Sequence, residues 1–350
     1  MAEILLTIFF ISVLLFFLGS GIWVALSMIG VSAIGMMLFT SRPVGDAMAT
    51  TIWGTSSSWT LTALPLFVWM GEILFRTRLS ENLFKGLSPW MQKLPGGLIH
   101  VNVVGCALFA AISGSSAATV ATVGKMSIPE LRKRNYPEKI LLGSLAGSGT
   151  LGLLIPPSII LIIYGVAVQE SIAKLFIAGI IPGIMIALIF MSYVIIWSLI
   201  NKKSMPKIIE EYSFLEKIKR SKQLLPVIIL ILAVIGSIYT GIATATEAAS
   251  LGVVGALILS YFQKSLTLKT FKSSLLGATK TSCMIAFILA GSTFLSLAMG
   301  FTGLPRNLAL WIQNMDLSPY VLIFVLMIFY IILGMFLDGI SAVVLTMAII

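Results

Sequence analysis

Two apolar segments of this chain are each interrupted by a small polar cluster, and the interruptions lie 225 residues apart (114 and 339). The first segment covers residues 106–119 and the second covers 331–344. An interrupted apolar helix exposes backbone groups that lipid cannot satisfy, so it persists only where it lines a protein-buried or watery cavity. Two such interruptions at corresponding places in two halves indicate the binding site of a transporter. The positions that recur at this offset are Gly114 with Gly339, Ser116 with Ser341, and Ala117 with Ala342.

The composition assigns the chain to the membrane proteins. Hydrophobic residues make up 58% of it and charged residues 10%, and the mean hydropathy is +1.06. Several runs approach the roughly 20 apolar residues that cross a bilayer. The net charge of +10 fits basic cytoplasmic loops better than nucleic-acid binding. Cys106 and Cys283 both lie in apolar segments, so they predict neither a disulfide framework nor a metal site.

The apolar pattern predicts an all-α polytopic membrane protein with continuous and interrupted segments. A discontinuous span is expected over about 139–168, with its interruption between Gly147 and Pro157. Helical hairpins are expected at 98–124 and 319–350, each turning at its small polar cluster. Continuous spans are expected near 4–18, 22–40, 60–75, 175–200, 223–240, 243–262 and 281–300.

Basic residues predict the membrane topology. Of the 23 Lys and Arg residues, 20 fall in four clusters, and the positive-inside rule places all four in the cytoplasm. Because two clusters flank the hairpin at 98–124, this hairpin must enter and leave the membrane on one face. The span at 281–300 then starts inside and ends outside, so the hairpin at 319–350 opens on the other face. The clusters are 76–93, 125–139, 202–222 and 264–280.

The topology therefore predicts two inverted repeats, a common plan for secondary transporters. The first repeat covers residues 1–200, the second covers 223–350, and a cytoplasmic amphipathic linker at 201–222 joins them. Charged and apolar residues alternate over 206–223, a pattern typical of a helix on the membrane surface. Flanking matches at the same offset support the repeat: Thr77, Leu79, Asn82 and Leu83 recur as Thr302, Leu304, Asn307 and Leu308.

The interruptions supply oxygen atoms for a cation site. Serine hydroxyls at the first turn, with backbone carbonyls left free by Pro156 and Pro157, form a set of neutral oxygens that suits Na⁺. N–H groups at the start of a half-helix suit a carboxylate. The alternative is close helix packing, because Gly, Ser and Thr are enriched where membrane helices touch. The predicted Na⁺ ligands are Ser113, Ser115, Ser116, Gly149 and Thr150, and the wider Na⁺ and substrate site adds Gly114, Gly152, Ile155, Pro156, Asp338, Gly339 and Ser341.

Ionisable residues within apolar segments have competing interpretations, since each is costly at the bilayer centre. Asp338, at the second interruption, serves either the binding site or a cap at the hairpin tip. Glu72 is interpreted as a packing residue that reaches toward the membrane surface, and Glu247 as a cap at a helix start. His100, the single histidine, is expected at the membrane interface rather than in a proton relay.

The sequence carries no motif of an enzyme. It has no His-Glu-x-x-His zinc motif and no phosphate-binding Gly-x4-Gly-Lys-[Ser/Thr] loop. A serine nucleophile at Ser115 or Ser116 would need His100 as its base, and nothing else in the sequence indicates that pairing. No organic cofactor is expected, and the energy for transport must come from an ion gradient or from another subunit.

Four motifs resemble those of the large membrane subunit of tripartite ATP-independent periplasmic (TRAP) transporters, and the resemblance covers essentially the whole chain. The motifs are 113–119, 149–158, 246–249 and 334–338; the family usually has a proline where Ala245 stands. The resemblance implies an elevator-type fold, in which a domain with two hairpins carries substrate and Na⁺ past a fixed scaffold. It also implies the bacterial inner membrane, a small four-span membrane subunit, and a periplasmic substrate-binding protein that delivers an organic acid such as a C4-dicarboxylate, a keto acid or a sialic acid.

Two other functions stay open: a stand-alone Na⁺-coupled anion transporter of related architecture, and a channel-like or assembly subunit. Neighbouring genes for a small subunit and a binding protein would favour the tripartite system. Stoichiometric Na⁺ dependence of uptake would separate a coupled carrier from a channel. The repeat also predicts that a further Gly/Pro-interrupted segment, echoing 149–157, follows residue 350 and completes the second repeat.

Overall fold

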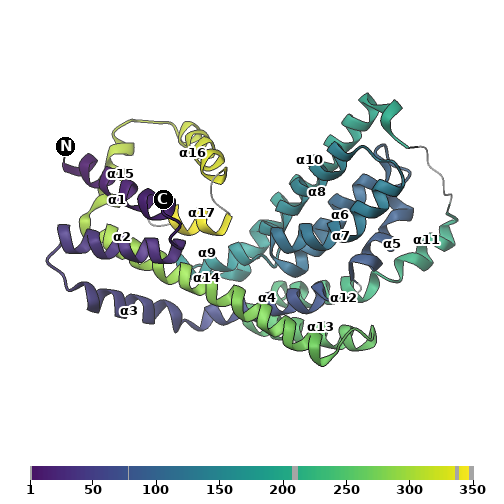
Figure 1. Ribbon diagram of the computed structural model, residues 1–350, viewed down its shortest axis with the longest axis horizontal. Helices are drawn as coiled ribbons and strands as arrows, with labels where there is room; N and C mark the ends of the chain where they lie inside the picture. Colours follow the sequence, from purple (N-terminus) through teal and green to yellow (C-terminus); the bar gives the residue numbers. More distant parts are fainter. Residues whose placement is uncertain (1, 78, 207–211, 336–338, 347–350) are drawn as a thin grey trace. The chain divides into compact units, whose positions relative to one another are not determined.

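The computed structural model describes residues 2–77, 79–206, 212–335 and 339–346, and all regular structure in these ranges is helical (Figure 1). The predicted all-α class is therefore confirmed. Three of these helices are long and apolar enough to cross a membrane, and the number rises to five if two bent helix pairs each count as one span. Shorter apolar helices accompany them. The set is consistent with a polytopic membrane protein.

Most of the predicted spans correspond to single helices. A long apolar run forms a helix in a bilayer because the helix satisfies its own backbone hydrogen bonds. The matching helices are α1 (Ala2–Gly19), α2 (Val24–Phe39), α4 (Ala63–Phe75), α10 (Ile172–Ile200), α12 (Leu225–Tyr239) and α13 (Ala245–Phe262).

The structure differs from the predicted spans in two places: it has an additional helix before α4, and α14 begins earlier than expected. α3 (Val44–Ser56) and the short 3₁₀ helix η1 (Trp59–Thr62) precede α4, although their mixed polar and apolar residues lack the long apolar run that signals a span. α14 (Leu268–Thr302) begins within the basic segment 264–280 instead of near 281. Lysine has a high helix propensity, and 35 residues extend for about 52 Å, well beyond the hydrocarbon core.

The chain forms two compact units, and each unit combines helices from both predicted repeats. Unit 1 comprises Met1–Leu61, Val166–Gln169 and Ser282–Ile350, and unit 2 comprises Thr62–Gly165 and Glu170–Thr281. The boundaries of the two predicted repeats therefore differ from the boundaries of the two compact units.

Unit 2 is built around the contact between α4 and α13. A Cβ on Gly252 of α13 would lie 2.5 Å from the Met70 sulfur of α4 and 3.2 Å from a methyl group of Val234 in α12. The three helices thus approach closely through a small residue, as membrane helices commonly do. α4 also meets α6 closely, because a Cβ on Gly71 would lie 3.0 Å from the Ser113 Cα.

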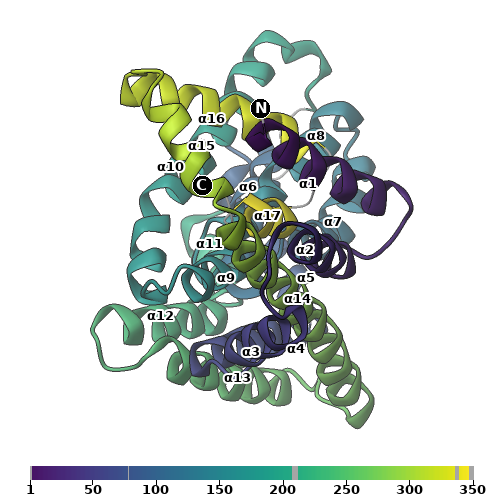
Figure 2. The same ribbon diagram turned by 90° about the vertical axis from the view of Figure 1, so that its left-hand side faces the viewer.

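Unit 1 repeats this arrangement with α2 and the C-terminal part of α14. Met36 of α2 is buried together with Phe294 and Ala298 of α14. A Cβ on Gly291 of α14 would lie 2.8 Å from the Ala25 carbonyl oxygen of α2, so these two helices also meet backbone to backbone. Figure 2 turns this side of unit 1, with α1, α2 and α17 (Gly339–Thr346), toward the viewer.

The order of the helices supports an internal repeat. A shift of 225 residues places α1 on α12, α2 on α13, and α4 on the last part of α14; α5 (Leu79–Met91) and α15 (Leu304–Gln313) begin at equivalent residues. The α4–α13 contact of unit 2 then corresponds to the α14–α2 contact of unit 1. In each unit, a helix of one repeat is covered by a helix of the other. The inverted orientation of the repeats in a membrane stays a prediction.

The predicted linker contains two short helices. These are the 3₁₀ helix η4 (Lys202–Ser204) and α11 (Phe214–Ser221). α11 begins with a capping box, in which the Glu216 carboxylate accepts a hydrogen bond from the Ser213 N–H at 3.0 Å. Residues 207–211 of the linker lie outside the described ranges.

We expect cysteines introduced at the two open ends of the first hairpin to react from the cytoplasmic side. Lys93→Cys and Lys133→Cys each replace an exposed lysine within a basic cluster, which favours the cytoplasm. A membrane-impermeant maleimide should label both variants only from that face, in a Cys283→Ser background that removes the exposed native thiol. Asn314→Cys is the control and should label only from the opposite face. Labelling of the two lysine positions from opposite faces would show that 98–124 crosses the membrane.

Candidate functional site

The first hairpin consists of two helices joined by a tight turn. α6 (His100–Ser113) ends at Gly114, whose φ of +58° is in the left-handed region that glycine adopts without strain, and α7 (Ser116–Lys133) follows after Ser115. Two helices separated by a turn thus lie where the hairpin at 98–124 was predicted, and the second helix continues to Lys133. Re-entry into a membrane stays a prediction.

Hydroxyl groups fix the conformation of this turn. The Ser113 and Thr119 hydroxyls are hydrogen-bonded at 2.9 Å, and the Thr119 hydroxyl also lies 2.7 Å from the Ser115 carbonyl oxygen. The Ser115 hydroxyl accepts the Ala118 N–H at 3.4 Å, as an N-cap residue does. Each hydroxyl keeps lone pairs for a further partner, because a hydroxyl offers one donor and two acceptor positions.

A broken helix lies where the discontinuous span over about 139–168 was predicted. α8 (Glu138–Gly149) tightens into the 3₁₀ helix η3 (Thr150–Leu153), the chain is irregular to Ser158, and α9 (Ile159–Ala167) then resumes. Pro156 and Pro157 in the irregular segment have no N–H, so they cannot continue the hydrogen-bonding pattern of a helix.

The hairpin turn packs directly against this break. The Ile159 N–H donates a hydrogen bond to the Gly114 carbonyl oxygen at 3.4 Å. A Cβ on Gly114 would lie 2.9 Å from the Pro157 carbonyl oxygen, and a Cβ on Gly152 would lie 3.0 Å from the Ser115 carbonyl oxygen. Two non-helical stretches, expected from sequence to lie near each other, are thus in contact inside unit 2.

Glycines of α10 (Ile172–Ile200) let that helix pack closely against the irregular segment of the break. A Cβ on Gly179 would lie 2.8 Å from the Leu154 carbonyl oxygen and 3.6 Å from the Pro156 ring. A Cβ on Gly183 would lie 2.9 Å from the Ile155 side chain. The predicted site residues Ile155 and Pro156 therefore pack toward α10, which fits a positioning role for their side chains.

The structure brings most of the predicted residues of the first half together. The backbones that meet at the turn and the break belong to Gly114, Ser115, Ser116, Gly149 and Gly152, while Ser113 contributes its hydroxyl to the turn. Thr150 is different, because its side chain is exposed and its hydroxyl donates to the Gly147 carbonyl oxygen at 2.7 Å. The Thr150 hydroxyl is thus engaged within its own helical turn.

Two further hydroxyls at the break were missing from the predicted set. Ser148, next to Gly149, is fully buried, and its Oγ has no hydrogen-bond partner within the part of the chain that the structure describes. Ser158 is fully buried as well and donates to the Leu153 carbonyl oxygen at 2.5 Å. The sequence signal for both was a serine beside a glycine or proline in an apolar span. The unpartnered Ser148 hydroxyl also suggests an additional ligand, because a buried hydroxyl without a partner is costly.

The second hairpin lies in unit 1 and is described in part. α16 (Pro319–Gly334) forms its first arm and α17 its second. Asp338, predicted at its tip, lies outside the described residues. Gly339 begins α17, and Ser341 on the same helix is buried.

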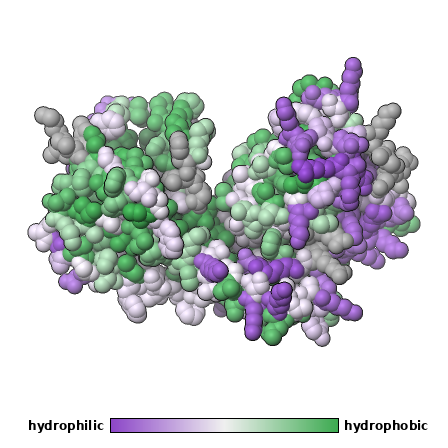
Figure 3. Space-filling view, in the orientation of Figure 1, coloured by the Kyte–Doolittle hydropathy of each residue, from purple (hydrophilic) through white to green (hydrophobic). Residues whose placement is uncertain are grey.

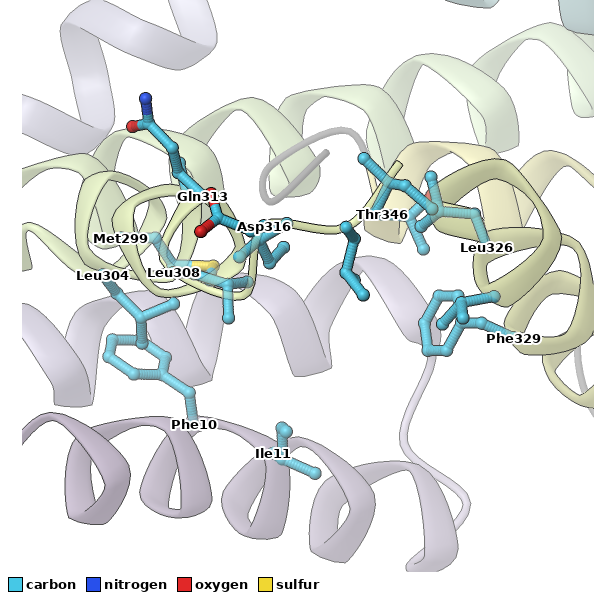
Figure 4. A pocket seen from close by; sticks show the side chains of 15 residues that line it. Phe10, Ile11, Met299, Leu304, Leu308, Gln313, Asp316, Leu326, Phe329 and Thr346 are labelled. Atoms are coloured by element: carbon cyan, nitrogen blue, oxygen red, sulfur yellow. The ribbon is translucent and has the colours of Figure 1, made fainter. Parts of the chain in front are cut away.

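Unit 1 also contains an apolar cavity of about 900 Å³ beside this hairpin (Figure 4). Side chains of α1, α15 and α16 line most of it, and Gln313, Asp316 and Thr346 contribute polar atoms. Hydrocarbon dominates the lining, so this cavity is a poor match for the set of oxygens that a hard cation requires.

The ionisable residues in the apolar helices have structural partners. The Glu72 carboxylate forms an ion pair with Arg76, which also donates to the Ser273 hydroxyl at 3.1 Å, so Glu72 is a packing residue as predicted. Glu247 accepts the Thr244 N–H at 2.8 Å and caps α13, also as predicted. His100 begins α6 and is fully buried, and its Nε2 lies 2.8 Å from the Pro95 carbonyl oxygen; its position at the membrane interface stays a prediction.

Comparison with known proteins identifies the family. A family model described as the DctM component of the tripartite ATP-independent periplasmic transporter matches residues 9–350. The chain belongs to this family. As a TRAP large subunit, it is a membrane-embedded transporter component and not an enzyme.

Its similarity to individual TRAP proteins extends over most of the chain. The C4-dicarboxylate TRAP transporter large permease protein DctM of Pseudomonas aeruginosa is 33% identical over 318 residues, which cover 90% of this chain and 73% of that protein. The sialic acid TRAP transporter large permease protein SiaM of Vibrio cholerae is 31% identical over 325 residues, covering 92% and 75%. The 2,3-diketo-L-gulonate TRAP transporter large permease protein YiaN of Escherichia coli is 32% identical over 299 residues, covering 83% and 68%.

We expect Gly152→Ala to destabilise unit 2 of this TRAP subunit. The new methyl group would lie 2.9 Å from the Ser115 carbonyl carbon, and backbone atoms on both sides leave little room to relax. Overpacking of this kind costs about 1–3 kcal/mol. Gly143→Ala in α8 is the matched control, because nothing lies within 4 Å of its Cβ position. Thermal unfolding in detergent should show a lower midpoint for Gly152→Ala alone; equal midpoints would show that the turn and the break are not in close contact.

Proposed function

We propose that this TRAP large subunit uses an inward Na⁺ gradient to drive uptake of an organic acid that a periplasmic substrate-binding protein delivers. The relatives are named for C4-dicarboxylates, sialic acid and 2,3-diketo-L-gulonate, all of which carry carboxylate groups. A carboxylated substrate of that class is therefore proposed for this chain. The protein works in the bacterial inner membrane together with a small four-span membrane subunit.

The observation that carries the proposal is the contact between the first hairpin turn and the α8–α9 break. Broken membrane helices offer carbonyl oxygens to a cation and N–H groups to an anion at the same depth. A Cβ on Gly149 would lie 3.6 Å from the Ser116 carbonyl oxygen, so the first turn of α7 faces the end of α8. Neutral oxygens of this kind suit Na⁺ as a transported ion, and the start of α7 suits a carboxylate.

Burial of Ser148 strengthens the assignment of the cation site. Its hydroxyl lies beside Gly149 and has no hydrogen-bond partner in the described ranges, so the lone pairs of its oxygen are free to coordinate a cation. Ser113, Ser115 and Ser116 are the other proposed ligands, with backbone oxygens at Gly149 and Thr150. Asp338, Gly339 and Ser341 are proposed to form the equivalent substrate-side group on the second hairpin.

Movement of a hairpin-bearing domain past a scaffold is the proposed transport step. The equivalence of helices at the 225-residue offset supports it, because inverted repeats allow two related conformations that open to opposite sides. The transport assay is uptake into proteoliposomes containing this chain, its small subunit and its binding protein, with a panel of carboxylates. Uptake without an imposed Na⁺ gradient would contradict the coupling, and uptake without the partner proteins would favour a stand-alone transporter.

We expect Ser148→Ala to weaken Na⁺ dependence of uptake. Loss of one neutral oxygen ligand should raise the Na⁺ concentration for half-maximal uptake by about tenfold, equivalent to ~1.4 kcal/mol. Ser127→Ala is the matched control, because Ser127 is equally buried and also has no partner in the described ranges, but lies toward the other end of α7. Unchanged Na⁺ dependence in Ser148→Ala, with normal expression, would place the cation site elsewhere.

A further inference from the structure

Helix α11 in the linker presents large apolar side chains that are exposed within the part of the chain that the structure describes. Phe214 is 65% exposed, Leu215 is 76% exposed and Ile218 is 41% exposed. At 100° per residue, these three residues lie on one face of the helix. Large apolar residues grouped on the exposed face of a polar helix indicate a binding surface.

One flank of α11 is fixed to α5. The rings of Phe214 and Trp90 meet edge to face with their centroids 6.3 Å apart, and the Trp90 Nε1–H donates to the Ser221 hydroxyl at 2.7 Å. The Lys217 ammonium lies 5.4 Å from the centre of the Trp90 ring, close enough for a cation–π contact. These contacts set the rotation of α11 about its axis and leave Leu215 and Ile218 exposed.

Positive charge surrounds the uncovered face. Lys219, Arg220 and Lys222 are exposed, while the carboxylate of Glu216 is engaged by the capping box. In Figure 3, hydrophilic residues gather over the part of unit 2 that carries α5 and α11. A cationic helix with one apolar face matches the boundary between the headgroups and acyl chains of an anionic membrane.

The geometry of the neighbouring span suits such a location. α11 and α12 are separated by a short break and are bent by 57° relative to each other. At the break, Leu224 packs against α5, where a Cβ on Gly86 would lie 2.6 Å from the Leu224 Cγ. A helix that leaves a membrane span at this angle, next to a cytoplasmic basic cluster, runs toward the membrane surface.

We propose that α11 binds anionic phospholipids of the cytoplasmic leaflet and thereby holds α5 through Trp90. Leu215 and Ile218 enter the acyl-chain boundary, and Lys219 and Lys222 contact the lipid phosphates. A second copy of the helix is a poorer occupant, because it would bring the same positive charges together. The proposal rests on the cytoplasmic orientation predicted for the linker; it does not depend on the transported substrate or on Na⁺ coupling.

The depth of α11 in a bilayer tests this assignment. A nitroxide attached after Leu215→Cys, in the Cys283→Ser background, reports its depth through accessibility to oxygen and to a water-soluble nickel chelate. The full chain is reconstituted in nanodiscs of phosphatidylcholine with increasing phosphatidylglycerol, in potassium chloride. We expect the label to move from the aqueous phase into the acyl region as phosphatidylglycerol increases, and to return at high salt, since screening weakens the attraction.

Charge variants make the test specific. Lys219→Gln with Lys222→Gln should weaken this docking by roughly 25-fold, or about fivefold per charge, and shift the transition to a higher phosphatidylglycerol fraction. Lys202→Gln with Lys203→Gln is the matched control, because it removes the same charge from η4 in the same linker and should leave the transition in place. The proposal is overturned if the label depth ignores phosphatidylglycerol, if the control pair shifts the transition equally, or if inorganic phosphate alone reproduces the change.

Discussion

The architecture of unit 2 depends on the requirement that backbone polar groups find partners wherever water is excluded. A continuous helix would satisfy its own backbone hydrogen bonds, but the α8–α9 break interrupts that pattern. The neighbouring hairpin turn supplies a partner for a backbone group at the break instead. The Gly114 carbonyl accepts the Ile159 N–H, and the glycines at positions 114 and 152 let the two backbones touch. The same contact that makes the break tolerable also concentrates oxygens and N–H groups at one place. The proposed cation site therefore uses the same backbone atoms that hold the turn and the break together.

Much of this arrangement could be predicted from the sequence, because its causes are local. The left-handed turn at Gly114, the Pro156–Pro157 break and the capping box at Glu247 each follow from the chemistry of a few neighbouring residues. The 225-residue offset could be found because it aligns small residues in otherwise apolar runs. These patterns predicted the hairpin and the broken span in unit 2.

What could not be predicted concerns the direction in which side chains point. A helix that is apolar on all sides gives no periodic signal for its buried face, so nothing distinguished the exposed Thr150 from the buried Ser148 two residues before it. The burial of His100 inside the protein was likewise not predicted; its Nε2 lies within hydrogen-bonding distance of the Pro95 carbonyl oxygen. The start of α14 at Leu268 was not predicted, because the lysines before residue 281 indicate a cytoplasmic segment but do not end a helix.

The exchange of partners between the repeats has a consequence for biosynthesis. α4 is made early, but the helix that covers it, α13, belongs to the second repeat and leaves the ribosome much later. Until then, Met70 and its neighbours on α4 lack the surface against which they pack in the finished unit. The first half cannot therefore reach its final packing as it is inserted. The nascent protein therefore completes the packing of α4 only after α13 has been made and inserted.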